Sequence, residues 1–357
     1  MSTMRGYIFE DINKPAWRDD IPIPVPERDE IVIKPVIVAP CTSDVHILET
    51  GALPTLKGKP MGHEAAGLVH AIGPDVKLFK PGDKVAIPAT AVDWCVPAVQ
   101  NGYDKYIQLS PYSSPDPRLG GCFAEYMLVQ QGDLNCAVIP DGVTWEQAVA
   151  CTDMATTAFE GVEWLDLRFG QTVVVYGIGA VGQMALAAAA LKGAARIIGI
   201  GSRPITFEVG AKMGGTDFID YRNGDVVAQV LELNGGPVDA VITCGGGDIS
   251  AMTDALRMVP NGGRVANVAF YAADSQWSVP TGADSWWWGL ADKTVRGLTT
   301  RGGRGFLERL LLLAKYGRFH PEYIVTHTYH GMDHIPEALD KMGGHDRTAI
   351  KPVVFFD

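Results

Sequence analysis

Hydrophobic residues in the first part of the chain come in short runs that proline and glycine interrupt. These runs lie at residues 21–26, 30–38, 65–72, 84–87 and 124–129. Short apolar runs bounded by turn-forming residues are typical of β-strands, because a surface helix needs a longer amphipathic stretch. The pattern therefore predicts a β-rich domain of partly irregular strands over roughly the first 150 residues.

From about residue 155 the pattern changes to strand-like and helix-like segments in alternation. The strand-like runs lie at 171–177, 195–201, 217–221, 238–246 and 262–270, and helical patterns lie between them at 180–192, 205–213, 226–233 and 250–258. Alternation of this kind predicts a mostly parallel sheet covered by helices on both faces. The doubly wound nucleotide-binding fold, an α/β fold, is therefore expected in this part.

The end of the chain is predicted to return to the first domain. Residues 306–316 have the apolar spacing of a buried helix, and residues 349–357 have the composition of a strand. We therefore expect one domain over 1–154 and 300–357, and a nucleotide-binding domain over 155–299.

Charge and cysteine content narrow the choice of partners. Over 357 residues the formal net charge is -11, whereas a nucleic acid or an anionic membrane would attract clustered lysine and arginine. The N-terminal residues lack a signal-peptide core, and the richest apolar stretch, 184–191, is too short to span a bilayer. The 6 cysteines are dispersed, as expected of reduced thiols. We expect a cytoplasmic protein that acts on a small molecule and binds neither nucleic acid nor membrane.

A glycine motif marks the candidate nucleotide site. It lies directly after a predicted strand and opens a predicted helix, and it consists of Gly177, Ile178, Gly179, Ala180, Val181 and Gly182. The first glycine permits a tight turn, the second lets the backbone approach a pyrophosphate, and the third lets the helix pack on the strand. The helix N-terminus then offers N–H groups to the phosphates. The alternative is a glycine-rich turn in a domain that binds no nucleotide.

The end of the next strand indicates which cofactor is bound. NAD sites usually carry an acid there, about 20 residues beyond the glycines, that holds the ribose hydroxyls. This chain instead has Gly201, Ser202 and Arg203, and the arginine fork suits a phosphate dianion. NADP is therefore predicted over NAD, unless Arg203 is merely a solvated residue at the helix start. Tyr221, after the third strand, can stack beside the adenine or fill the sheet edge.

Two short segments carry groups that bind metals. Cys41, Ser43 and His46 lie in the first, and His63 and Glu64 lie side by side between two glycines in the second. A thiol, an imidazole and a carboxylate suit zinc, whose catalytic sites use three protein ligands and one open position. The alternative is that Cys41 and His63 are ordinary buried residues.

The segment "GHEAAGLVHAIG" at 62–73 resembles the G-H-E-x-x-G-x5-G signature of the zinc-dependent medium-chain alcohol dehydrogenases. "PGDKV" at 81–85 and the glycine motif follow in that family's order. More narrowly, "CTSDVH", "TDMATTAF", "GIGAVG" and "GSRP" resemble the NADP-dependent secondary alcohol dehydrogenases of the isopropanol dehydrogenase type. The resemblance covers nearly the whole chain. It implies a GroES-like catalytic domain, a Rossmann domain and a homotetramer, with a dimer as the alternative.

The resemblance assigns the metal ligands by position. Cys41, His63 and Asp153 match the three ligands of the catalytic zinc, and Glu64 matches a carboxylate that occupies the fourth place when substrate is absent. The glycines beside His63 and Glu64 are interpreted as bends that let Glu64 approach and retreat. Cys151 is an alternative to Asp153, but residues two apart face different ways, so only one of them can point at the metal.

The same resemblance assigns the proton path and the substrate wall. Ser43 matches the hydroxyl that takes the substrate proton, and His46 matches the imidazole that passes it to solvent, although His46 could merely bond a backbone carbonyl. The residues that match the substrate pocket are Ala89, Thr90, Tyr271, Leu298 and Thr299, with Tyr112 near an aromatic lid.

Many relatives hold a structural zinc through four closely spaced cysteines, which this chain lacks. Residues 89–121 contain only Cys95, and Cys122 lies just beyond them. Two thiols so far apart cannot complete a closed tetrahedral site. One zinc per subunit is therefore predicted.

The expected reaction is the reversible oxidation of secondary alcohols to ketones with NADP. The nearest alternative is a polyol or amino-alcohol dehydrogenase on the same scaffold, which would differ in pocket polarity. The other alternative is a noncatalytic NADPH-binding relative, which would have no chemical need for Cys41, His63 and Asp153.

Overall fold

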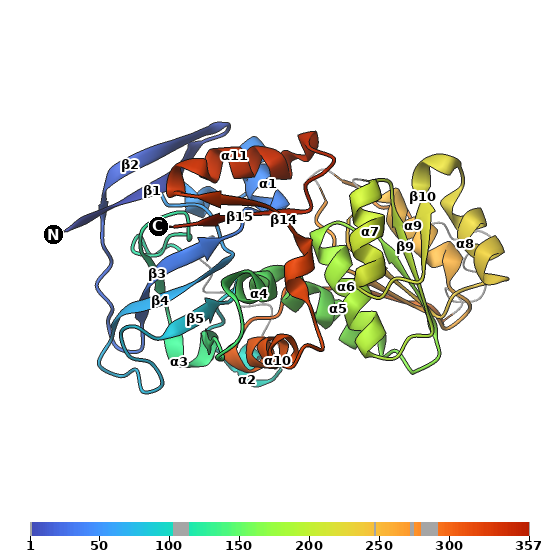
Figure 1. The fold of residues 1–357 in the computed structure, drawn as a ribbon, viewed down its shortest axis with the longest axis horizontal. Coiled ribbons are helices and arrows are strands. Elements are labelled where there is room, and N and C mark those ends of the chain that lie inside the picture. The colour runs from blue at the N-terminus through green and yellow to red at the C-terminus, as the bar shows by residue number, and fades with distance from the viewer. Residues whose placement is uncertain (1, 103–113, 246–247, 272–274, 280–291, 357) are drawn as a thin grey trace. The chain divides into compact units, whose positions relative to one another are not determined.

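The computed structural model describes residues 2–102, 114–245, 248–271, 275–279 and 292–356 (Figure 1). Contacts within the chain divide it into two units. The first consists of Met1–Thr156 and Thr300–Asp357, and the second consists of Thr157–Thr299.

The first unit is rich in β-strands, as the short apolar runs predict. A hairpin pairs β1 (Thr3–Asp11) with β2 (Lys14–Pro22). The larger sheet has the order β14 (Val325–His330), β15 (Lys351–Phe355), β3 (Ile31–Val38), β4 (Ala65–Ile72), β5 (Lys84–Ile87) and β7 (Ala137–Val138), and β6 (Met127–Val129) also pairs with β3. The strands of this unit pair antiparallel, except that β14 and β15 are parallel. The C-terminal strand β15 lies against β3, with Val354 opposite Val38, so the last strand of the chain joins the sheet of the N-terminal part.

The strand predicted at 21–26 is largely wrong. The observed strand β2 ends at Pro22, because Pro24 and Pro26 have no N–H group with which to continue the ladder. The N-terminal strand β1 was not predicted, since its apolar residues are mixed with charged ones.

The helices of the first unit include α1 (Thr42–Thr50), α2 (Pro97–Gln100), α3 (Gly132–Asn135), α4 (Trp145–Ala150), α10 (Arg304–Lys315) and α11 (Ile335–Asp340). Several of them pack on its larger sheet, among them α4 on β3, β4 and β5. Helix α10 matches the helix predicted at 306–316 within two residues at its start. The core includes Ile31, Ile33, Val85, Phe123 and Val354, all fully buried.

The second unit is the predicted doubly wound sheet. Its strands run in the order β10 (Asp217–Asp220), β9 (Arg196–Gly201), β8 (Thr172–Tyr176), β11 (Ala240–Thr243), β12 (Arg264–Asn267) and β13 (Thr294–Gly297). Every neighbouring pair is parallel. The strand order reverses direction at β8, which is the switch point where such sheets bind ligands. The predicted α/β fold is confirmed.

Helices connect these strands as the alternating pattern predicts. They are α6 (Ala180–Leu191), α7 (Pro204–Lys212), α8 (Val226–Asn234) and α9 (Ser250–Met258). Helix α5 (Thr156–Leu165), which was not predicted, precedes β8. The strand predicted at 238–246 is shorter than expected, since β11 covers only Ala240–Thr243. The strands pack against these helices through a second core that includes Val174, Ile198, Val241, Leu256 and Val265.

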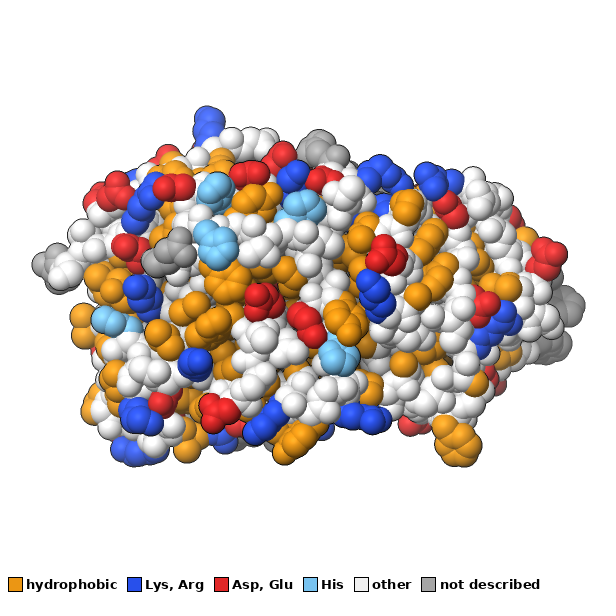
Figure 2. All heavy atoms as spheres, in the orientation of Figure 1, with side chains coloured by type: hydrophobic (Ala, Val, Ile, Leu, Met, Phe, Trp, Pro, Cys, Tyr) orange, Lys and Arg blue, Asp and Glu red, His pale blue; other side chains and the backbone are white. Residues whose placement is uncertain are grey.

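On the face drawn in Figure 2, lysine and arginine side chains are interspersed with aspartate and glutamate over the described residues. No helix in the described ranges is both long enough and apolar enough to cross a bilayer.

Candidate functional site

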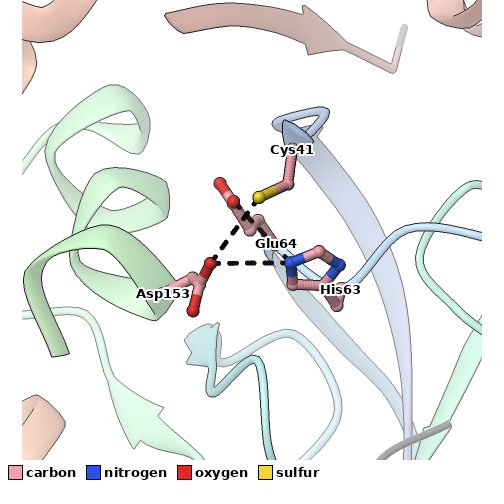
Figure 3. A group of neighbouring side chains, drawn as sticks. All are labelled: Cys41, His63, Glu64 and Asp153. Atoms are coloured by element: carbon pink, nitrogen blue, oxygen red, sulfur yellow. Dashed lines mark hydrogen bonds and ion pairs between the residues drawn. The ribbon is translucent and has the colours of Figure 1, made fainter. Parts of the chain in front are cut away.

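Four side chains of the first unit meet at one point. Cys41, His63, Glu64 and Asp153 each offer one ligand atom, and these atoms all lie within 4.8 Å of one another (Figure 3). His63 Nε2 is 3.5 Å from Asp153 Oδ2 and 3.8 Å from Glu64 Oε1, and Cys41 Sγ is 4.0 Å from Asp153 Oδ2. The fold thus gathers a sulfur, a nitrogen and two carboxylates from distant positions, and we call this group the donor cluster.

Helix α1 positions the sulfur of the donor cluster. Cys41 is the residue before the helix and has extended backbone, with φ of -116° and ψ of 154°. Asp44 lies in the first turn, and its Oδ2 accepts a hydrogen bond from the Cys41 N–H at 2.9 Å. Since such a bond satisfies a backbone donor that the helix leaves unpaired, it holds Cys41 at the helix start.

The glycines around His63 and Glu64 serve close packing. A Cβ on Gly62, which has φ of 84°, would lie 2.3 Å from the Phe123 ring. A Cβ on Gly67, inside β4, would lie 2.3 Å from the Lys34 carbonyl oxygen of the paired strand. Both substitutions are therefore sterically forbidden. The interpretation of these glycines as bends that let Glu64 approach and retreat stays a prediction.

A π-helical turn at Cys151–Ala155 separates the two alternative ligands. Asp153 points into the donor cluster, whereas Cys151 is fully buried elsewhere and is not one of its members. Burial raises the pKa of the Cys151 thiol, which makes it a poor source of thiolate. Turns of this kind, with one extra residue, often occur at functional sites because they redirect side chains.

A buried lysine lies against the donor cluster. Lys351, on β15, is 1% exposed and its Nζ lies 2.7 Å from Oε1 of Glu64, which is 0% exposed. Burial opposes the charge of Lys351, but Glu64 and Cys41 outweigh it and raise the lysine pKa. Burial also raises the pKa of Glu64 well above its usual value, although Lys351 opposes this shift. The second carboxylate oxygen, Glu64 Oε2, has no hydrogen-bond partner within the described part of the chain.

These observations fit a zinc ion. A buried carboxylate oxygen without a partner is costly, and a metal would satisfy it. Burial alone would raise the Cys41 pKa, but Lys351 and His63 lower it, which favours the thiolate form that binds metals. When the three acidic donors are ionised, Lys351 compensates only one negative charge, so a divalent cation would be favoured.

Asp44 and Lys351 are functional residues that sequence reasoning missed. Asp44 is fully buried, and its Oδ1 is 3.1 Å from His63 Nδ1. Because that hydrogen bond assigns the ring proton to Nδ1, it leaves the Nε2 lone pair facing the donor cluster. The acid three residues after Cys41 is a capping signal that could have identified Asp44. No comparable signal exists for Lys351, which is separated from Glu64 by 287 positions.

The two residues assigned to proton transfer both lie on α1. Ser43 Oγ is 3.4 Å from His63 Nε2, so the structure brings Ser43 to the donor cluster. His46 lies one turn further along the helix, with its side chain 43% exposed and its Nδ1 4.0 Å from Glu49 Oε2. A half-exposed imidazole at that position is able to exchange protons with water.

The residues assigned to the substrate pocket fall in both units. In the first unit, Ala89 and Thr90 are buried, and the Ala89 N–H donates to the carbonyl of Thr152, the neighbour of Asp153. In the second unit, the Tyr271 hydroxyl and the Leu298 N–H both donate to Asn267, and Thr299 ends that unit. Tyr112 lies outside the described residues.

The glycine motif of the second unit forms a tight turn after β8. A Cβ on Gly177, which has φ of 89°, would lie 2.3 Å from the Gly245 carbonyl oxygen, and one on Gly182 would lie 2.1 Å from the Gly177 carbonyl oxygen. A Cβ on Gly179 would meet no heavy atom closer than Arg203 Nη2 at 4.0 Å. The turn is therefore closed on its inner side and open at Gly179, directly before α6. This shape fits a pyrophosphate at the helix N-terminus.

The residues assigned to cofactor selection lie next to this turn. Arg203 precedes α7, and its Nη2 is the atom that faces the position of a Gly179 Cβ. Ser202 Oγ and the Tyr221 hydroxyl are 2.9 Å apart, and Tyr221 is 49% exposed. The side chains of Ser202, Arg203 and Tyr221 therefore lie near the C-terminal end of β9. No carboxylate residue lies between Gly201 and the start of α7.

Comparisons with known proteins match both units. Residues 27–141 match the family model described as alcohol dehydrogenase GroES-like domain, and residues 180–311 match that of the zinc-binding dehydrogenases. The NADP-dependent isopropanol dehydrogenases of Clostridium beijerinckii and Thermoanaerobacter brockii are 41% and 39% identical, covering 98% of this chain and 99% of each relative. The solved alcohol dehydrogenase from Thermus sp. ATN1 superposes with a TM-score of 0.85 and 26% identity, over 99% of this chain and 100% of that one.

Proposed function

The chain belongs to the zinc-binding alcohol dehydrogenase family, and on this premise we propose that it oxidises secondary alcohols to ketones, reversibly and with NADP. The observation that carries the proposal is the buried donor cluster of Cys41, His63, Glu64 and Asp153. Similarity over the full length to two isopropanol dehydrogenases supports the secondary-alcohol class of substrate.

Cys41, His63 and Asp153 would hold one zinc ion, and Glu64 would be a fourth, exchangeable ligand. A zinc ion there would supply Lewis-acid polarisation of the substrate oxygen. Asp44 orients His63 through Nδ1, and Lys351 holds one oxygen of Glu64, so both residues fix the donors around the site. One zinc per chain stays the prediction. It is supported within the described residues by the exposure of Cys95 and by the burial of Cys122, whose thiol donates to the Glu64 carbonyl.

The second unit would bind NADP at the glycine turn. The N–H groups at the start of α6 would face the pyrophosphate, and Arg203 with Ser202 would bind the 2′-phosphate. Bound NADP supplies the acceptor for the hydride, so that a secondary alcohol and NADP⁺ give a ketone, NADPH and one proton. No carboxylate at 201–203 opposes the phosphate charge.

The released proton would pass from the substrate hydroxyl to Ser43 and then to His46. Ser43 Oγ lies at the donor cluster, and the half-exposed ring of His46 can deliver the proton to water. In the reverse direction the same groups would return a proton to the oxygen of the reduced ketone.

Replacing His46 with alanine is expected to lower kcat by about tenfold or more without loss of metal, because proton exit slows while the ligands stay in place. A matched control is His334→Ala, since His334 is also half-exposed and also faces an acid three residues on, Glu337. Initial rates of NADPH formation and metal analysis measure both effects. Added imidazole should restore part of the lost rate in the first variant alone, and an unchanged rate in His46→Ala would remove His46 from the proton path.

A panel of substrates and cofactors tests the proposed reaction. We expect NADPH formation from isopropanol, with kcat/KM at least about tenfold higher than for sorbitol and at least about tenfold higher with NADP than with NAD. Faster oxidation of sorbitol than of isopropanol would favour the polyol dehydrogenase alternative. Binding of NADPH without turnover of any alcohol or ketone would favour the noncatalytic alternative.

The resemblance also implies a homotetramer, and the sequence predicts a cytoplasmic location; both statements stay predictions. Light scattering on the purified protein distinguishes a tetramer from a dimer, and cell fractionation tests the location.

A further inference from the structure

A buried glutamine joins the two segments to which the proposed function assigns NADP. Gln183 lies in α6, directly after the glycine motif, and is 0% exposed. Its Nε2 donates to the Ile178 carbonyl at 3.0 Å and to the Thr206 carbonyl at 2.8 Å. Because both partners are acceptors, the amide nitrogen must face them. The side chain therefore bridges the glycine turn and the first turn of α7.

The first partner, Ile178, is the centre of the glycine turn. Its N–H donates to the Ile200 carbonyl at 3.2 Å, and its side chain is buried against the end of β9. A Cβ on Gly201 would lie 2.6 Å from Ile178 Cγ1. The turn is thus packed closely on the strand that leads to Ser202 and Arg203.

The second partner, Thr206, holds the backbone of Arg203. The Thr206 hydroxyl donates to the Arg203 carbonyl at 2.8 Å, and the Thr206 N–H donates to the same oxygen at 3.0 Å. Thr206 is buried, so water does not compete for these bonds. A chain of hydrogen bonds therefore runs from Ile178 through Gln183 and Thr206 to Arg203.

We propose that Gln183 is a positioning residue for cofactor selectivity, which sets the spacing between the pyrophosphate-binding turn and Arg203. The inference rests on the proposed function, in which Arg203 binds the 2′-phosphate. An arginine fork binds a phosphate well only when its position relative to the rest of the ligand is fixed. Loss of the bridge would weaken contacts to the 2′-phosphate more than contacts to the remainder of the nucleotide.

The test compares two ligands that differ by the 2′-phosphate. Gln183→Met keeps the length of the side chain and removes its two donors. By calorimetry on the full chain, the affinity for adenosine 2′,5′-bisphosphate should fall by about threefold to tenfold, the value of a lost hydrogen bond. The affinity for adenosine 5′-monophosphate should change by less than about twofold. An equal loss for both ligands would overturn the inference.

A control variant separates selectivity from stability. Thr216→Val removes a hydroxyl that bonds Ile197 at the opposite end of β9, where it accepts from the Ile197 N–H at 2.9 Å. This variant should lower Tm and leave the ratio of the two affinities unchanged. Such a result shows that a lost hydrogen bond in this sheet does not by itself alter selectivity, whereas a changed ratio would overturn the inference.

A second variant keeps the inference testable if Gln183→Met fails to fold. Thr206→Val retains the carbonyl that accepts from Gln183 and removes only the hydroxyl that donates to the Arg203 carbonyl. It should therefore lower the affinity for adenosine 2′,5′-bisphosphate relative to that for adenosine 5′-monophosphate. Suppose that the wild type prefers adenosine 2′,5′-bisphosphate and that the folded variants keep the same ratio of the two affinities. This result would overturn the role of Gln183 and leave the proposed function intact. A wild type that binds both ligands equally would overturn the NADP preference, and the inference with it.

Discussion

Replacing His63 with alanine is expected to remove the bound zinc and to lower kcat/KM for isopropanol by about a thousandfold or more. His63 supplies the single nitrogen of the donor cluster, and the three remaining donors are a thiol and two carboxylates. Without the ring, the cluster loses both a ligand and the geometry that Asp44 imposes on it. Metal analysis and initial rates of NADPH formation measure the two losses.

Two further variants serve as comparisons for His63→Ala: one as a control and one with an intermediate loss of zinc affinity. His70→Ala removes an exposed histidine from β4, the strand that follows Glu64, and should leave zinc content and kcat unchanged. Asp44→Asn should lower the zinc affinity by about 10- to 100-fold, because it weakens the hydrogen bond that orients His63. Excess zinc should then restore activity in Asp44→Asn and not in His63→Ala. Full metal content and activity in His63→Ala would contradict the assignment of this ligand.

Replacing Arg203 with alanine is expected to raise KM for NADP by about 10- to 100-fold and KM for NAD by less than about twofold. A guanidinium bound to a phosphate makes charge-assisted hydrogen bonds, and only NADP carries a phosphate at the 2′ position. Initial rates at saturating isopropanol, with each cofactor varied, give the two KM values.

Arg222 provides the matched control for this prediction. It is an exposed arginine at the end of the neighbouring strand β10, and its guanidinium is paired with Asp220. Arg222→Ala should therefore leave the preference for NADP unchanged. Equal changes in both KM values on replacing Arg203 would show that this residue does not recognise the phosphate.

The nucleotide-binding unit could be predicted closely from the sequence because its signals are local. The glycine motif, the strand before it and the helix after it occupy adjacent positions, so their contacts need no long-range folding information. The order of strands and helices then fixes a parallel sheet. The contacts of Gln183 could not be predicted in this way, since only the folded structure buries this side chain between two backbone carbonyls.

The metal-binding unit was harder to predict because its contacts join distant parts of the chain. Lys351 comes from the last strand, and a lysine in an apolar run gives no sign that it will pair with a buried glutamate. The choice of Asp153 over Cys151 depends on a π-helical turn that periodicity does not reveal. The glycines beside His63 could be recognised, but their reason, close contact with Phe123 and Lys34, required the packed structure.

The metal content of protein purified without chelators, measured together with its turnover, tests the central claim most directly. The account predicts about one zinc per chain, loss of isopropanol oxidation when a chelator removes it, and recovery when zinc is returned. Protein that is free of transition metal and still oxidises isopropanol with NADP at the full rate would contradict it.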